Sequence, residues 1–120
     1  MAQQRSYRDL VAWQKALALA RTTYRYSAAL PKEEVYGLRS QLTRAAISVP
    51  ANIAEGQARH GTAEFLHSLS IARGSLAELV RLFILREDLK LLPKEDLDPV
   101  LSDCAEVGKL LTALMHSLRR

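Results

Sequence analysis

The sequence predicts an all-α protein, an antiparallel up-down-up-down bundle of four helices. Apolar residues recur at intervals of three and four along four long segments, which is the spacing of one helix face. Short breakers separate these segments, and short connections make consecutive helices antiparallel neighbours. The 120 residues include only five glycines, four prolines and 6% aromatics, which suits helices better than a many-turned β fold. We therefore expect one domain with helices at about 6–28, 33–58, 63–90 and 94–118.

The first two helices are predicted from a cap, an apolar stripe and a turn that contains proline. Ser6 is a suitable N-cap residue for the first helix. The string 30–34 (LPKEE) ends this helix and begins the second, since proline fits a first helical turn and acids favour the positive end of the helix dipole. Pro50 removes a backbone donor inside the second helix, so we expect a bend there. The apolar stripe of the first helix consists of Leu10, Trp13, Leu17, Ala20 and Tyr24.

The last two helices follow from similar signals. Gly56 and Gly61 bracket a break, after which Thr62 is a candidate N-cap. A second string of proline and acids, 92–96 (LPKED), precedes the fourth helix. The main stripe of the third helix is Phe65, Leu69, Ala72, Leu76, Leu79, Val80 and Phe83. The stripe of the fourth is Leu97, Val100, Leu101, Cys104, Val107, Leu111, Leu114, Met115 and Leu118.

The second helix has two apolar faces, which one core cannot cover. Leu38, Leu42, Ala45, Val49 and Ile53 share one side, and a second set lies roughly opposite. The third helix also has apolar residues away from its main stripe. We therefore expect further copies of the chain to cover an interface made of Tyr36, Ile47, Ala51, Ala54, Ile71, Leu82 and Leu85.

A polar row runs between the two apolar faces of the second helix. Its members are one turn apart, so a ladder of hydrogen bonds is feasible. We interpret the row as a buried network that fixes register and assembly, with a ligand pocket as the alternative. In the third helix, Gly74 would let another helix come close and Ser75 could bond across that contact. The row consists of Gln41, Arg44, Ser48, Asn52 and Glu55, continuing to Arg59.

The charge distribution points weakly to nucleic acid. The net charge is +4, and residues 1–60 hold nine basic and four acidic side chains, against eight and nine in residues 61–120. Twelve of the seventeen cations are arginine, which suits bidentate phosphate contacts. The alternative is a solvated surface on which arginine pairs with Glu or Asp. Candidate contacts to RNA or DNA are Arg21, Arg25, Arg39, Arg59, Arg73 and Arg81, with Arg44 and the pair Arg119 and Arg120.

Enzymatic and metal chemistry have little support. His60, Glu64 and His67 share a face only loosely, and a zinc site would need a further ligand. No nucleophile elbow or pair of acids framed by a cleft is recognisable, so we expect no enzyme activity and no cofactor. Cys104 is the only cysteine, which favours a reducing compartment, and no secretory or membrane-spanning segment is apparent. We expect a cytoplasmic protein without a membrane partner.

Four strings in the chain resemble a known bacterial family. They are DLVAWQKA at 9–16, LPKEE at 30–34 followed by Tyr36-Gly37-Leu38, RAAISVPANIAEG at 44–56 and IARGSLAEL at 71–79. Together they are similar to the four-helix bundle proteins also called 23S rRNA intervening-sequence proteins, over residues 6–118. The resemblance implies an antiparallel four-helix bundle that assembles as a homopentamer.

A related branch of this family has a known partner class. It is similar to the accessory variability protein of diversity-generating retroelements, a basic pentamer that contacts nucleic acid and a reverse transcriptase. The resemblance therefore implies the chain itself, RNA or DNA, and a reverse transcriptase or other protein as partners. The family name records the location of some of its genes within ribosomal RNA genes, which does not by itself imply a ribosomal role.

Overall fold

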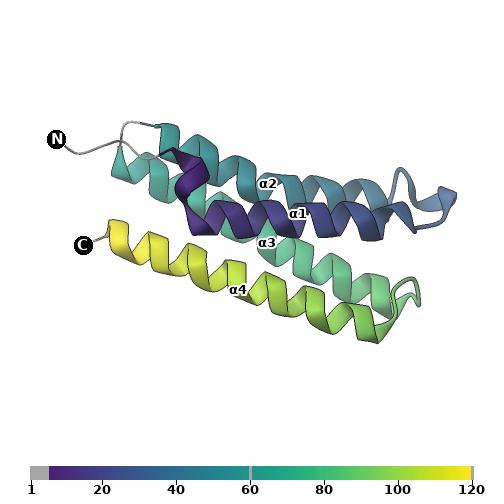
Figure 1. Cartoon of the computed structure of the whole chain (residues 1–120). Coiled ribbons are helices and arrows are strands. Elements are labelled where there is room, and N and C mark those ends of the chain that lie inside the picture. Colours follow the sequence, from purple (N-terminus) through teal and green to yellow (C-terminus); the bar gives the residue numbers. More distant parts are fainter. Residues whose placement is uncertain (1–5, 60, 120) are drawn as a thin grey trace.

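Four α-helices make up the protein, as a computed structural model that describes residues 6–59 and 61–119 shows (Figure 1). They are α1 (Val11–Ala28), α2 (Leu38–Ala58), α3 (Thr62–Asp88) and α4 (Lys94–Leu118), with short 3-10 helices η1 (Tyr7–Asp9) and η2 (Lys32–Glu34). No strand occurs in the described residues. The all-α prediction with four helices is therefore correct, and the molecule measures 52 × 24 × 19 Å.

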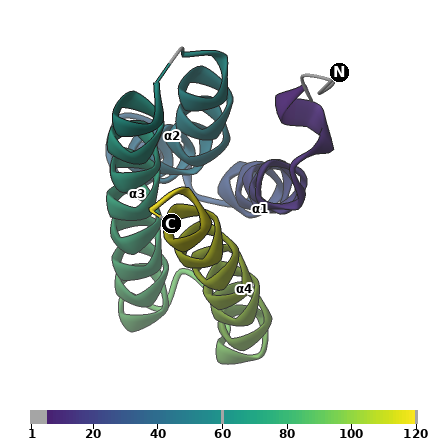
Figure 2. The ribbon, with the colours of Figure 1, turned by 90° about the vertical axis from the view of Figure 1, so that its left-hand side faces the viewer.

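The helices form a closed circuit of contacts around one core. α1 packs on α2, α2 on α3, α3 on α4 and α4 on α1, whereas the backbones of the diagonal pairs α1/α3 and α2/α4 stay apart. Figure 2, which is turned by 90°, shows the four elements around this circuit. The largest fully buried apolar side chains are Phe83, Leu42, Ile53, Leu69, Leu79, Leu111 and Met115.

The start of the chain departs from the prediction of one helix from residue 6. Ser6 caps η1, its Oγ accepting the Arg8 N–H at 3.1 Å, and Leu10 then adopts an extended conformation that ends η1 before α1 begins. The rings of Tyr7 and Trp13 meet edge to face, with centroids 5.1 Å apart. This contact places η1 against the first turn of α1.

The core face of α1 also differs from the predicted stripe. Leu17 is half-buried and Tyr24 is exposed. Mostly small and polar residues are buried instead. The large apolar residues of α1 therefore predict a core side that is rotated about the helix axis from the observed one. Thr23 fits there because its hydroxyl donates to the Leu19 carbonyl at 2.9 Å. The buried residues of α1 are Ala12, Ala16, Leu19, Ala20, Thr23 and Ser27.

Two turns explain where the other helices begin and end. α2 starts at Leu38 and not near residue 33, because η2 intervenes and the Glu34 carboxylate then accepts the Leu38 N–H at 3.2 Å. α2 continues through Pro50 as one helix. Thr62 is the first residue of α3, and Gly61 occupies the cap position predicted for it.

The end of α3 is closed by a turn of unusual composition. The Lys90 N–H donates to the Glu87 carbonyl at 2.8 Å and the Leu91 N–H to the Arg86 carbonyl at 2.9 Å, which is a Schellman ending. Lys90 has φ 62°, the left-handed conformation that glycine usually supplies in this motif. The fourth helix then begins after Pro93, with Glu95 and Asp96 in its first turn.

Candidate functional site

The polar row of α2 follows the junction between α2 and α3. At its centre, the hydroxyls of Ser48 and Ser75 are 2.7 Å apart. The Asn52 amide Nδ2 donates to the Ser48 carbonyl at 2.9 Å and to its Oγ at 3.0 Å. All three side chains are half-buried. The centre of the row therefore joins two helices of the same chain.

The two ends of the polar row are open in the single chain, so the burial of the whole network stays a prediction about the assembly. Gln41 and Arg44 are exposed and line a hollow of about 400 Å³ together with Ser75 and Glu78. A second hollow, of about 410 Å³, lies at the other end. Its lining includes Asn52, Glu55, Arg59, Glu64, His67, Ser68 and Ile71.

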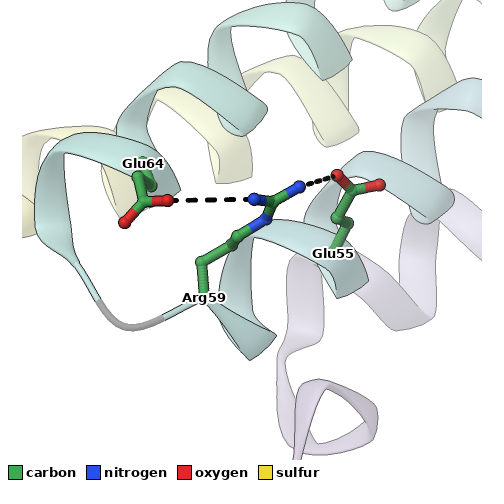
Figure 3. Close-up of polar contacts among 3 residues, drawn as sticks. All are labelled: Glu55, Arg59 and Glu64. Atoms are coloured by element: carbon green, nitrogen blue, oxygen red, sulfur yellow. Dashed lines mark hydrogen bonds and ion pairs between the residues drawn. The ribbon is translucent and has the colours of Figure 1, made fainter.

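An ion triad closes the end of this junction near the α2–α3 turn. The Arg59 guanidinium lies between two carboxylates, 2.7 Å from Glu55 and 3.8 Å from Glu64 (Figure 3). The hydrogen bond to Glu55 and the charges of both acids raise the pKa of Arg59, against a small opposing effect of burial. Glu55 thus pairs one turn along its own helix, and all three side chains remain exposed to solvent.

Apolar side chains flank the polar row on both helices. We call this surface the outer α2–α3 face, defined by Ile47, Ala51, Ile71, Gly74 and Leu85. Ile47, Ile71 and Leu85 are 45%, 43% and 44% exposed. Two residues predicted to lie in the interface are less exposed than these three: Leu82 packs against the chain's own core, and Ala54 is half-buried. Tyr36, in the turn before α2, is 96% exposed.

Two glycines on these helices have opposite surroundings. A Cβ at Gly56 would lie 2.7 Å from the Ser68 Cβ and 2.9 Å from the Phe65 Cδ1, so this glycine allows α2 and α3 to approach closely. A Cβ at Gly74 would meet no atom of the described chain within 4 Å. Within the chain, the close approach of another helix that we predicted at Gly74 is therefore absent. It occurs instead at Gly56, which the sequence pattern indicated only as a helix breaker.

The candidate arginines do not gather on one face. Arg21 and Arg25 are exposed on α1, while Arg73 and Arg81 are exposed on α3, and the backbones of these two helices are not in contact. Arg39 is half-buried at the start of α2. Of the six residues predicted to bind nucleic acid, only Arg59 has an ion pair with another described residue. Arg25 donates to the Thr22 hydroxyl at 3.3 Å.

Comparison with known proteins identifies the family. A model of the family described as 23S rRNA-intervening sequence protein matches residues 8–113. The chain belongs to this family. No curated protein matches it.

A solved structure shares the fold of this family member. The crystal structure of a protein of unknown function from the S23 ribosomal protein family of Bacteroides thetaiotaomicron VPI-5482 is 24% identical in sequence, with a TM-score of 0.83. The alignment covers 88% of this chain and 96% of that one. The likeness shows a common arrangement of helices.

One arginine of the family member, Arg86, is buried, although the sequence did not predict it to be. Arg86 is 2% exposed. Its Nε donates to the Leu91 carbonyl at 2.9 Å and its Nη2 to the Tyr26 carbonyl at 2.6 Å. Burial lowers the pKa of Arg86, while the charges of Tyr26 and Asp96 raise it. The sequence signal that could have indicated its burial is its position three residues after Phe83, which continues the spacing of the core stripe of α3.

Other titratable groups of the family member offer no assembled chemical centre. Within the described residues no three His, Cys, Asp or Glu side chains are grouped as metal ligands, and His60 lies outside those residues. Burial raises the pKa of the Cys104 thiol to about 12, with a further contribution from Asp103. None of the helices in the described part of the chain is sufficiently long and apolar to cross a membrane.

Proposed function

We propose that this chain is a non-enzymatic subunit of a homo-oligomeric scaffold that binds RNA or DNA. In this proposal the subunit is an antiparallel four-helix bundle, and five copies assemble through the outer α2–α3 face. The lone Cys104 favours a reducing compartment, so we place the scaffold in the cytoplasm.

The outer α2–α3 face is the observation that carries the proposal. It combines half-exposed Ile47, Ile71 and Leu85 with the open polar ends at Gln41 and Arg44. Half-exposed aliphatic side chains beside polar groups are typical of a surface that is buried on association.

Gly74 supports the same surface. A glycine inside a helix is less favourable than alanine by about 1 kcal/mol. The described chain offers no steric reason for Gly74, because the space above it is empty. A second copy of the chain that packs closely over α3 would supply that reason.

Unpaired arginines support the nucleic-acid part of the proposal. Arg21 and Arg81 are exposed and have no ion pair among the residues that the structure describes. The alternative of a surface neutralised by Glu and Asp holds for Arg59 but not for these two. Assembly would multiply such unpaired charges around a ring, which strengthens attraction to phosphates.

Light scattering on a pair of matched variants tests the assembly. Ile47 on the outer α2–α3 face and Ile84 away from it are 45% and 46% exposed. We expect the wild-type mass to be a multiple of 13.4 kDa, Ile47→Asp to reduce it, and Ile84→Asp to leave it unchanged. A wild-type mass of one subunit, or equal behaviour of the two variants, would remove this part of the proposal.

Fluorescence anisotropy with single-stranded RNA and duplex DNA tests the binding. We expect affinity to fall steeply with salt, since binding releases counterions. Arg21→Ala and Arg81→Ala should each weaken binding and lower the salt slope by up to about one unit, whereas the already paired Arg59→Ala should do less. Absent or salt-insensitive binding would contradict the proposal.

A further inference from the structure

A second open surface lies on α4 beside Arg73 of α3, where the structure has a shallow, wide-open groove of about 810 Å³. Its floor is made of the small residues Ala105, Gly108, Thr112 and Ala113 of α4. The two helices are inclined to each other in both Figure 1 and Figure 2. No Phe, Tyr or Trp side chain lines this groove.

The ionisable residues that line this groove are all basic. Arg73 contributes from α3, and Lys109 and His116 contribute from α4. No acidic residue lines the groove. None of the three basic side chains has an ion pair or hydrogen bond to another described residue. An occupant with carboxylates along its edges would therefore complement the groove.

Gly108 deepens the groove without being required by the packing of α3 on α4. A Cβ at this position would lie 3.5 Å from the Leu76 Cδ2, which is an ordinary contact. Alanine would therefore fit here and would favour the helix. Glycine instead lowers the floor, so that an apolar side chain of an occupant can sit closer to the two helices.

We propose that the α3–α4 groove binds an amphipathic helix of another protein, with its apolar side on the small-residue floor and acidic residues facing Arg73, Lys109 and His116. Apolar grooves that receive helices bind one apolar face in this way. A single-stranded nucleic acid is a poorer fit, because bases stack on successive aromatic side chains and the groove offers only the His116 ring.

This groove is separate from the surface proposed for assembly. The outer α2–α3 face and the groove share no residue, and six of the seven groove residues lie on α4; the seventh, Arg73, is next to Gly74 in α3. The groove proposal therefore does not depend on the homo-oligomer. Variants of the groove should keep the wild-type mass in light scattering, which distinguishes a failure of one proposal from a failure of the other.

The probe is a fluorescein-labelled helical peptide of about 18 residues, long enough to be helical with strong helix formers. It carries leucines at i, i+3, i+4 and i+7 and glutamates along both edges of that stripe. A second peptide with lysine in place of every glutamate is the control. We expect anisotropy to show binding of the acidic peptide and none of the basic one.

Protein variants locate the binding site of the peptide. Gly108→Leu should raise the Kd at least about tenfold by filling the floor, whereas Gly108→Ala should change it by less than about threefold. The double variant Arg73→Glu/Lys109→Glu should also raise the Kd at least about tenfold. Its control is Arg8→Glu/Lys32→Glu, in η1 and η2 away from α3 and α4, which changes the net charge equally and should bind as the wild type does.

Three results would overturn the proposal. One is the absence of peptide binding to wild-type protein at about 100 μM. Another is an equal loss of peptide affinity in the groove variants and in the control variant. The third is displacement of the peptide by single-stranded RNA whose own binding is lost in the groove variants, which would assign the groove to nucleic acid. Circular dichroism of each variant establishes that it is folded.

Discussion

The two ends of the bundle use arginine in opposite ways. Near the α2–α3 turn, Arg59 is exposed and lies between the carboxylates of Glu55 and Glu64. At the other end, Arg86 is buried and donates to the carbonyls of Leu91 and Tyr26, with no carboxylate in hydrogen-bonding distance. The arginine that pairs with carboxylates, Arg59, is therefore not the arginine that connects the helices, Arg86.

Helix ends explain how Arg86 can be buried without an acid beside it. Its two acceptors lie close to helix C-termini, since Tyr26 is in the last turn of α1 and Leu91 follows α3. Free carbonyls give a helix C-terminus a partial negative charge, which stabilises a nearby cation. Arg86 thereby connects α1, α3 and the turn before α4.

Removing Arg86 should produce the largest effect of any change discussed here. Arg86→Ala leaves the Leu91 carbonyl without its side-chain donor, removes one of the two donors to the Tyr26 carbonyl and opens a cavity, so we expect a loss of about 3 kcal/mol in the free energy of unfolding. Urea denaturation followed by circular dichroism measures it. Arg86→Met, which keeps much of the volume, should lose less. Equal stability of Arg86→Ala and the wild type would refute the structural role.

The two glycines sharpen the contrast at the level of packing. Gly56→Ala should lower the stability of the subunit by about 2 kcal/mol, because its Cβ would collide with Ser68 and Phe65. Gly74→Ala should raise the stability of the isolated subunit by about 1 kcal/mol, because the position is open there and alanine favours a helix, and should weaken an assembly in which a second copy packs over α3. Thermal unfolding of both variants in parallel is the measurement. A reversed order would mean that α2 and α3 pack differently from the structure.

Lys90 tests the strain at the Arg86 end. Its φ of 62° disfavours any residue with a Cβ, so Lys90→Gly should raise stability by up to about 1 kcal/mol. The gain is partly offset because glycine is more flexible in the unfolded chain. Lys94→Gly, in the first turn of α4, is the control and should lose stability. Destabilisation by Lys90→Gly would argue against the left-handed turn.

Arg59 should give the smallest effect. Its carboxylate partners are exposed, and solvent screens such pairs. We expect Arg59→Ala to leave the denaturation midpoint within experimental error at physiological salt. Repeating the titration at low salt should reveal a small loss, since screening is weaker there. If Arg59→Ala lowered the free energy of unfolding as much as Arg86→Ala, the two arginines would not differ in their contribution to stability.

The sequence revealed the four helices but not the details that depend on packing. Proline, glycine and apolar spacing locate α3 and α4 to within two residues, because these signals act locally. The phase of α1 was missed, since apart from Leu19 its core face is built from alanines, Thr23 and Ser27, which fit only because of the neighbouring helices. Arg86 was missed for the same reason. Its acceptors are a carbonyl sixty residues away and one in the following turn.

The polar row shows the same limit for the candidate site. Its i, i+3 and i+4 spacing correctly placed Ser48 and Asn52 together, since that depends on one helix alone. The contact from Ser48 to Ser75 required the register of α2 against α3. Distinguishing Gly56 from Gly74 also required three-dimensional packing, because both are glycines within helices.

The burial of Cys104 gives the molecule an internal reporter of its own opening. Its thiol is enclosed in the core, and only a thiolate in contact with solvent reacts readily with a labelling reagent. The rate of modification at fixed pH therefore measures how often α4 separates from the other helices, without any engineered probe. Because the sequence contains a single cysteine, every labelled molecule records that one event.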